Sequence, residues 1–329
     1  MKKEILALLK RNPGEYVSGE DVSHQLSVSR TAIWKHIQAL REEGYQIESQ
    51  SRLGYRLQEV PDKLYPEEVQ DGLSTNIIGQ SIIYYERLGS TNDLAKVLAA
   101  QGVIEGTVVV AEEQSSGRGR RGRAWASPGG HGVWMSVLLR PKLSPANAPK
   151  ITIMAAVAVV RAIERVCGLK VGIKWPNDIV YKGKKLAGIL TEMSAEIDSI
   201  NHIVLGIGTN VNVPLEAFPE EIQEKGTSLL IATGQQVSRV AYLRALLEEL
   251  EVAYVQFCTE QFDTILDGWR KHSVTLGEDV RVEGIGEVLF GTAADIDSQG
   301  ALLLRQKDGE MVKVLAGDVT LRKEDGSYC

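Results

Sequence analysis

The chain has 329 residues, of which 43% are hydrophobic and 24% are charged, and its formal net charge at pH 7 is −6. This length allows two or three domains with buried cores, and the balance of residue types excludes the compositions of disordered and collagen-like proteins. Neither a membrane span nor a secretory leader is predicted, because the longest apolar stretch covers only residues 151–160 and the first residues keep their charges.

The placement of charges and cysteines limits which nucleic-acid contacts, disulfides and metal sites can be expected. Residues 1–60 hold 9 Lys and Arg against 8 Asp and Glu, a net charge of +1, whereas residues 273–329 hold 6 against 11, a net charge of −5. Any contact with nucleic acid must therefore come from a local surface. Cys167, Cys258 and Cys329 are far apart, which predicts neither a disulfide framework nor a zinc site and fits a reducing cytoplasm.

The first segment, residues 1–63, has the pattern of a helix-turn-helix domain. A first helix is predicted over residues 1–10, and a second begins at Ser18, whose hydroxyl forms a capping box with the acid three residues later. A third helix covers residues 30–40 and turns one apolar stripe inward. Two short helices, a tight turn and a third helix with early basic residues are the arrangement that places a recognition helix in the major groove of DNA.

The outward residues at the start of the third helix are the predicted DNA contacts: Ser29, Arg30, Trp34 and Lys35. Strands predicted at residues 45–49 and 54–57 form a β-wing, with Arg52 and Arg56 near phosphates. The same pattern also fits a three-helix packing module that touches no DNA, in which Trp34 is a half-buried packing residue.

The middle segment, residues 64–272, predicts a mixed α/β catalytic domain. Apolar strands bounded by glycine and proline alternate with amphipathic helices, which is typical of a layered core. The predicted strands cover residues 107–111, 134–139, 179–181 and 203–208, and the predicted helices cover residues 91–100, 151–166 and 239–257.

The last segment, residues 273–329, predicts a small β domain. Short apolar runs alternate with turn signals rich in aspartate and glycine, as in a small barrel or sandwich. The predicted strands cover residues 280–282, 287–290, 301–305 and 311–315. The whole chain is thus expected to be a mixed α/β (α+β) protein of several domains.

The strongest single motif is the arginine loop, residues 117–123 (Gly-Arg-Gly-Arg-Arg-Gly-Arg), which follows a predicted strand. Its glycines match the dinucleotide fingerprint G-x-G-x-x-G, but that fingerprint requires a helix to open at the loop, and here Ala-Trp-Ala-Ser-Pro follows. The absence of a Gly-Lys-Ser/Thr sequence excludes a Walker loop. A close-approaching backbone with guanidinium groups suits a phosphate or carboxylate ligand. A solvated basic loop and an RNA-binding arginine–glycine patch are the alternatives.

Two further motifs carry weaker signals. Residues 90–93 (Ser-Thr-Asn-Asp) open a predicted helix, where hydroxyls and an amide either cap the helix or anchor a small ligand. Residues 174–178 (Lys-Trp-Pro-Asn-Asp) end a strand, and Lys185 begins the next after a turn at Lys182 and Gly183. A lysine at the root of a hairpin either projects into a cleft or is an ordinary surface residue.

Together these motifs resemble the biotin–protein ligase family, and more narrowly its bifunctional members that also repress the biotin operon. The resemblance covers nearly the whole chain. It rests on ordered motifs at residues 29–37, 90–92, 114 with 117–123, 174–178, 185–190, 206–212 and 317–322.

The resemblance implies a two-step reaction. The carboxylate of biotin attacks the α-phosphate of ATP to give biotinyl-AMP and pyrophosphate, and a lysine of a biotin carboxyl carrier protein of acetyl-CoA carboxylase then takes the biotinyl group. No protein nucleophile is required, which agrees with the absence of any Ser-His-Asp or Cys-His signal, so the enzyme supplies positioning and charge stabilisation. Mg²⁺ would accompany ATP, carried by the phosphates more than by protein ligands.

The resemblance also names the residues around the ligand: Ser90, Thr91, Asn92, Gln114, Arg118, Gly119, Arg120 and Lys185. Lys185 would contact the biotin carboxylate and the phosphate on which charge develops, and Arg120 would help to retain the reactive adenylate. Some relatives cover adenine with a tryptophan in the region corresponding to residues 224–228. This chain has none there, and Trp134 is the candidate in its place.

The resemblance further implies a cytoplasmic protein that binds operator DNA as a homodimer promoted by biotinyl-AMP. Two other functions stay open. Lipoate attachment belongs to the same fold group, and the arginine loop favours biotin over it. A ligand-sensing repressor without enzymatic activity could dispense with Arg120 and Lys185, and both are present.

Overall fold

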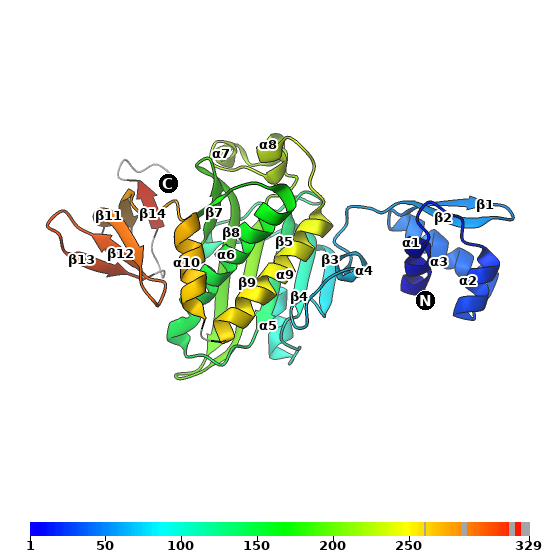
Figure 1. The fold of residues 1–329 in the computed structure, drawn as a ribbon, viewed down its shortest axis with the longest axis horizontal. Helices are drawn as coiled ribbons and strands as arrows, with labels where there is room; N and C mark the ends of the chain where they lie inside the picture. The colour runs from blue at the N-terminus through cyan, green and yellow to red at the C-terminus, as the bar shows by residue number, and fades with distance from the viewer. Residues whose placement is uncertain (260, 284–287, 316–319, 324–329) are drawn as a thin grey trace. The chain divides into compact units, whose positions relative to one another are not determined.

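The computed structural model describes residues 1–259, 261–283, 288–315 and 320–323 (Figure 1). It divides into two compact units, Met1–Lys63 and Leu64–Cys329. Part of the motif at residues 317–322 lies outside the described residues, as do Glu287 and Cys329.

The first unit is a helix-turn-helix followed by a β-hairpin. Its elements are α1 (Lys2–Arg11), α2 (Gly19–Leu26), α3 (Arg30–Glu42), β1 (Gln46–Gln50) and β2 (Gly54–Glu59). The predicted inward stripe of α3 is confirmed, because Ile33, Ile37 and Leu40 are almost wholly buried. Ser18 caps α2 by accepting a hydrogen bond from the Glu20 backbone N–H at 3.1 Å. These contacts give the three helices one shared apolar core.

The second unit is built on a large sheet with the strand order β3-β4-β5-β9-β8-β7-β6. Only β3 and β4 pair in parallel among these described strands. Their bounds are β3 (Ile82–Leu88), β4 (Val108–Gln114), β5 (Val133–Leu139), β6 (Gly172–Lys174), β7 (Asp178–Tyr181), β8 (Lys184–Ala195) and β9 (Ile200–Thr209). Lys182 and Gly183 both have positive φ, 49° and 75°, as a two-residue hairpin turn requires.

Helices cover both faces of this sheet. Val108 and Val110 of β4 pack with α6 (Ala148–Cys167) and α9 (Arg239–Cys258), whereas Val109 packs with α5 (Thr91–Ala100) on the other face. Figure 1 shows α6 and α9 crossing one face side by side. The remaining helices are α4 (Pro66–Gln70), α7 (Glu220–Gln223), α8 (Leu229–Thr233) and α10 (Phe262–His272), with short 3₁₀ turns at Arg120–Gly122, Pro145–Asn147 and Leu215–Ala217. The predicted mixed α/β layering is confirmed.

The C-terminal part of the second unit is a small antiparallel sheet with the order β13-β12-β11-β10-β14. Its strands are β10 (Asp279–Glu283), β11 (Val288–Ile296), β12 (Leu302–Arg305), β13 (Met311–Val314) and β14 (Thr320–Lys323). The pairings confirm a small β domain, and closure into a barrel stays a prediction.

Candidate active site and nucleic-acid interface

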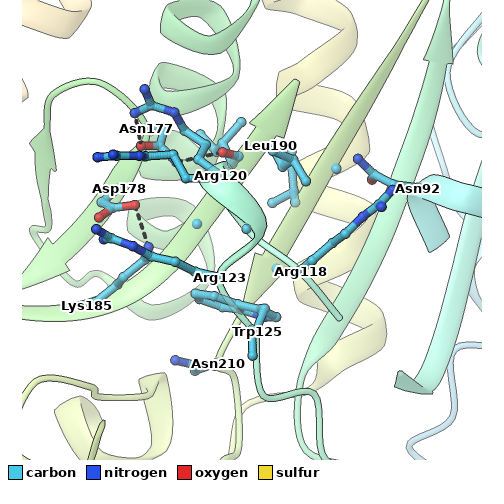
Figure 2. Close-up of a pocket in the computed structure, with 18 of the residues that line it drawn as sticks. Asn92, Arg118, Arg120, Arg123, Trp125, Asn177, Asp178, Lys185, Leu190 and Asn210 are labelled. Atoms are coloured by element: carbon cyan, nitrogen blue, oxygen red, sulfur yellow. Dashed lines mark hydrogen bonds and ion pairs between the residues drawn. The ribbon is translucent and has the colours of Figure 1, made fainter. Parts of the chain in front are cut away.

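A cavity of about 230 Å³ opens in the Leu64–Cys329 unit where the arginine loop faces the start of α5, the segment at residues 174–178, and strands β8 and β9 (Figure 2). The structure brings every residue that the sequence named around the ligand to the wall of this cavity: Ser90, Thr91, Asn92, Gln114, Arg118, Gly119, Arg120 and Lys185. Cations, hydroxyls and amides from four separate segments therefore meet at one cavity.

The start of α5 is held by a side chain from β4. Ser90 is the N-cap residue, yet its side chain makes no capping hydrogen bond, so the capping box predicted there is absent. Gln114 Oε1 instead accepts the Thr91 backbone N–H at 2.8 Å and lies 3.1 Å from the Thr91 hydroxyl. Because Gln114 serves the helix end, the Ser90 hydroxyl is not needed as a cap at the cavity wall.

The arginine loop has a defined backbone. The Gly119 N–H donates to the Arg123 carbonyl at 2.7 Å, and the Trp125 N–H donates to the Gly117 carbonyl at 2.8 Å. A Cβ at Gly117 would lie 2.5 Å from the Trp125 carbonyl oxygen, so only glycine allows this close approach. Arg121 adopts a left-handed conformation with φ 59°, which is uncommon for a residue with a side chain.

Two arginines of the loop extend to different sides of the cavity. Figure 2 shows Arg118 directed toward Asn92 and Arg120 directed toward Asn177. Arg118 pairs with Asp93 and lies 3.5 Å from the Glu192 carboxylate, and Arg120 donates from a terminal nitrogen to Asn177 Oδ1 at 3.1 Å. The loop thus bridges the start of α5 and the segment that connects β6 to β7.

Lys185 lies at the opposite end of the cavity from Asn92 in this view. Its Nζ is 2.6 Å from Asp178 Oδ1 and 5.1 Å from the centre of the Trp125 ring (Figure 2). Its backbone N–H donates to the Lys225 carbonyl at 2.7 Å, and its carbonyl accepts the Thr227 N–H at 2.9 Å. The ion pair and the ring face hold the ammonium group at the cavity, and the two backbone hydrogen bonds hold the backbone of the residue.

Glycines of β8 and β9 make room for the cavity wall. A Cβ at Gly208 would lie 2.5 Å from Trp125 Nε1, and one at Gly206 would lie 2.1 Å from Asn92 Oδ1. The first two glycines of the motif at residues 206–212 therefore leave room for the Asn92 and Trp125 side chains. It also closes the end of β9, where Asn210 Nδ2 donates to the Thr227 carbonyl at 3.0 Å.

Comparison with known proteins identifies the chain. The biotin/lipoate A/B protein ligase family model matches residues 84–210, an HTH domain model matches residues 2–56, and the biotin protein ligase C terminal domain model matches residues 275–322. The bifunctional ligase/repressor BirA of Bacillus subtilis is 41% identical over 321 residues, which cover 98% of each chain. The chain belongs to the biotin–protein ligase family.

Two further relatives are similar to this biotin–protein ligase, one over nearly the whole chain and the other over a smaller part of it. The bifunctional ligase/repressor BirA of Escherichia coli is 32% identical over 327 residues, covering 98% of this chain and 97% of that protein. The biotin protein ligase from Aquifex aeolicus, solved in complex with biotin and ATP, is 28% identical with a TM-score of 0.65 and covers 74% of this chain and 100% of its own.

The tryptophan predicted at the cavity of this biotin–protein ligase is not among the residues that line it. Trp134 is fully buried, packs with Val213 and Phe218, and is absent from the cavity lining. Trp125 lines the cavity, with its ring centre 6.4 Å from that of Trp134. The adenine role predicted for Trp134 is wrong, because the core encloses its ring.

Several residues in or near the cavity of this biotin–protein ligase were not among the predicted ligand residues. They include Trp125, Asn177, Asp178 and Glu192. Asn177 and Asp178 belong to a motif that the sequence did single out, so its spacing was the available signal. Trp125 and Glu192 had no local signal, because their positions depend on how the arginine loop and β8 fold against the rest of the sheet.

The helix-turn-helix presents its predicted contacts at the start of α3. Trp34 is 54% exposed, which favours a contact surface over the packing role, and Lys35 is exposed beside it. Ser29 is the N-cap of α3 and accepts the Ala32 backbone N–H at 3.2 Å. Arg30 lies 2.8 Å from Glu20 in an exposed ion pair, which is weak and can exchange for another anion.

The two wing arginines differ. Arg52 is exposed at the tip with φ 69°. Arg56 lies 2.5 Å from the Glu48 carboxylate and 4.7 Å above the Tyr16 ring, and hydrogen bonding to Glu48 raises the pKa of its guanidinium. Arg56 therefore braces the wing within this unit, and Arg52 is the better placed of the two for a phosphate.

In the described part of the chain, no group of three or more His, Cys, Asp or Glu side chains could hold a metal ion. No helix there is both long and apolar enough to cross a membrane. Cys167 and Cys258 are free thiols.

Proposed function

We propose that this cavity activates biotin with ATP and passes the biotinyl group to a lysine of a biotin carboxyl carrier protein. A carboxylate oxygen of biotin attacks the α-phosphorus, the bond to pyrophosphate breaks, and biotinyl-AMP forms. The amine of the acceptor lysine then attacks the biotinyl carbonyl and AMP leaves. The observation that carries the proposal is the convergence of Lys185, Arg118 and Arg120 with neutral hydrogen-bonding groups in one cavity.

The start of α5 and Lys185 lie at different ends of the cavity, which suits the two ends of biotin. Ser90, Thr91 and Gln114 offer hydroxyls and an amide to a polar, uncharged ring. Lys185 offers an ammonium to the carboxylate and to the negative charge that grows on the phosphate, where a fixed cation lowers the barrier. Arg118, Gly119 and Arg120 line the ligand between these ends, and Mg²⁺ enters with the ATP phosphates as part of that substrate.

Trp125 and Trp175 both line the cavity, and we assign the stacking on adenine to Trp125, the more exposed of the two. Its ring lies against Gly188 and Gly208 and has the Lys185 ammonium near its face. An adenine base gains from stacking on such a ring. This assignment takes the place of the one predicted for Trp134.

The same protein would act as a biotin-controlled repressor in the cytoplasm, where ATP, the carrier protein and operator DNA are found together. The helix-turn-helix carries the operator contacts, and biotinyl-AMP in the cavity promotes a homodimer that binds two half-sites. The bifunctional ligase/repressor names of two relatives over nearly their full lengths support this pairing of activities.

Biotin-dependent exchange of pyrophosphate into ATP is the direct test. The full-length protein with Mg²⁺ should show exchange with biotin and none with lipoate. Exchange with lipoate alone would assign the cavity to lipoate, the other compound in the name of the matching family. Lys185→Ala should reduce exchange on the order of 10²-fold or more, as loss of a contact to developing charge commonly does. Lys184→Ala, which removes the neighbouring exposed ammonium, is the matched control. Equal rates in the two variants would remove Lys185 from the site.

A further inference from the structure

A buried ion pair joins β4 to the first residue of α9. Arg239 Nη1 lies 2.6 Å from Glu112 Oε2, and each of these residues is only 2% exposed. Apolar side chains of similar volume often leave a protein as stable as a buried ion pair does, so stability alone does not explain this one. Charge-assisted hydrogen bonds do fix the positions of the groups that they join.

The other carboxylate oxygen of Glu112 holds the residue that follows the helix-turn-helix unit. Leu64 is the first residue after the Met1–Lys63 unit, and its backbone N–H donates to Glu112 Oε1 at 2.9 Å. Leu64 is fully buried. Because a buried N–H needs a partner inside the protein, the carboxylate holds the backbone of Leu64 in place.

Arg239 joins the same ion pair to the connection between β4 and β5, residues 115–132, which contains the arginine loop. Its Nη1 also donates to the carbonyl of Gly132, the last residue of this connection, at 3.3 Å. A Cβ at Gly132 would lie 2.1 Å from the Trp134 ring, so the backbone there is closely packed. One guanidinium therefore contacts both the end of the connection and the carboxylate that holds Leu64.

Further hydrogen bonds tie the end of this connection to its beginning at the cavity. The Trp134 indole N–H donates to the Pro128 carbonyl at 3.3 Å. The neighbouring Ser127 accepts at its Oγ from Gln114 Nε2 at 2.9 Å, and Gln114 lines the cavity. The whole connection is thus held at both ends, and a ligand placed against the arginine loop restricts the segment that Arg239 holds.

We propose that Glu112 and Arg239 are positioning residues that couple ligand binding in the cavity to Leu64, where the helix-turn-helix unit is attached. This inference rests on the proposed function, in which biotinyl-AMP lies against the arginine loop. Neither Glu112 nor Arg239 is among the residues that line the cavity, so the pair acts through the segments that it holds. The adenylate reduces local opening of the connection, and the Leu64 N–H is then exposed to water less often.

Hydrogen exchange at the Leu64 amide of the full-length protein tests this coupling. Pro61 and Pro66 have no N–H, so the segment between them carries backbone amides only at residues 62–65 and is readily followed by mass spectrometry. Saturating biotin and ATP with Mg²⁺ should slow hydrogen exchange at Leu64 about fivefold or more, as expected for a coupling between two sites. Unchanged hydrogen exchange in wild-type protein that forms biotinyl-AMP overturns the inference.

Glu112→Gln breaks the coupling at the ion pair. It keeps the size of the side chain and one oxygen for the Leu64 N–H, but it turns an NH₂ group toward the Arg239 guanidinium. The slowing at Leu64 by biotin and ATP should fall below about twofold. Pyrophosphate exchange should stay within about threefold of wild type, because no ligand contact is removed.

A double variant keeps the test decisive if Glu112→Gln does not fold with an unpaired buried arginine. Glu112→Gln combined with Arg239→Met removes both charges, a replacement that buried ion pairs often tolerate, and it should also lose the response of Leu64. Arg244→Met is the matched control. It removes a cation from the same helix that donates to the Glu68 and Val69 carbonyls at 2.8 and 3.3 Å, and it should keep the full response.

The response of Leu64 and pyrophosphate exchange together separate the possible results. A response that persists in the double variant overturns the inference, and so does a response lost equally in Arg244→Met. Loss of pyrophosphate exchange together with the response in the double variant marks a purely structural role and overturns it as well. If the wild-type chain shows no biotin-dependent pyrophosphate exchange, the proposed function fails instead.

Discussion

Arg120 connects the arginine loop to the segment between β6 and β7. Its guanidinium belongs to the arginine loop, and its hydrogen-bond partner Asn177 belongs to the connection between β6 and β7. Asn177 Nδ2 in turn donates to the Ile189 carbonyl at 2.8 Å, so the partner is anchored to β8. The contact joins the arginine loop to this segment, and the Arg120 guanidinium is at the cavity wall.

Arg120→Gly should therefore let the intermediate escape. Removal of the guanidinium loses both the Asn177 contact and a charge-assisted hydrogen bond to phosphate, which should speed release of biotinyl-AMP roughly 10- to 100-fold. Released adenylate should also label lysines of a bystander protein such as serum albumin. Release is measured by trapping free biotinyl-AMP after a single turnover.

Arg121→Gly is the control. It removes a guanidinium from the same loop at a left-handed position that suits glycine, and it should release the adenylate more slowly than Arg120→Gly. The reverse order would contradict the role of Arg120 in retaining the adenylate.

Individual site residues were predictable only where they belonged to a motif. The eight ligand residues that the resemblance to the biotin–protein ligase family implied belong to short motifs, and all eight line one cavity. Glu192 and Trp125 reach the site through the pairing of β8 with β9 and through the fold of the arginine loop, which are long-range features. Trp134 was misassigned because an exposed and a buried tryptophan look alike in sequence.

The segment at residues 174–178 ties the cavity to the small C-terminal sheet. Trp175 lines the cavity, its backbone N–H donates to Thr275 Oγ1 at 3.0 Å, and its indole N–H donates to the Gly300 carbonyl at 3.2 Å. The two residues that follow Pro176 hold Arg120 and Lys185. The C-terminal sheet therefore helps to set the positions of both predicted catalytic residues.

Trp175→Phe tests this connection between elements. The variant leaves the buried Gly300 carbonyl without its donor, which should cost about 1–3 kcal/mol in free energy of unfolding beyond the loss of ring volume. Pyrophosphate exchange should fall on the order of tenfold, because the segment that holds Asn177 and Asp178 is displaced. The matched control is Trp269→Phe, since the Trp269 indole is fully buried and its N–H has no hydrogen-bond partner. Denaturant unfolding and exchange rates are compared for both variants, and equal effects on exchange would refute the connection.

Elements were predictable where apolar residues recur in a regular pattern or form a continuous run. α5, α6 and α9 begin or end within three residues of their predicted bounds, because their apolar positions recur with the helical period. β3 was not predicted, as a partly exposed edge strand leaves a weaker alternation. α10 was also not predicted, although Phe262, Ile265 and Trp269 follow the helical period and are buried, so its signal was available.

The whole molecule combines a nearly neutral DNA-binding unit with an acidic remainder. Residues 1–60 carry a net charge of only +1 and the chain carries −6, so phosphate attraction by one copy is small. The contact residues at the start of α3 are nonetheless exposed, and Arg30 has only an exposed ion pair to give up. We therefore expect affinity for DNA to depend on the number of copies that bind together.

DNA binding should consequently require a dimer and the adenylate. Two linked copies on a palindromic site double the contacts and gain from effective concentration, so footprinting of the promoter of its biotin-synthesis genes with biotin and ATP should protect two half-sites. Without biotin, protection should be lost at the same protein concentration.

Deletion of residues 1–63 should abolish protection and leave ligation largely intact, because the division between compact units falls at Lys63. Trp34→Ala is the matched point variant, which removes an exposed ring from α3 without touching the cavity and should weaken protection while exchange continues. If the full-length protein protects the operator equally well without biotin, the helix-turn-helix still binds DNA but the adenylate does not control it.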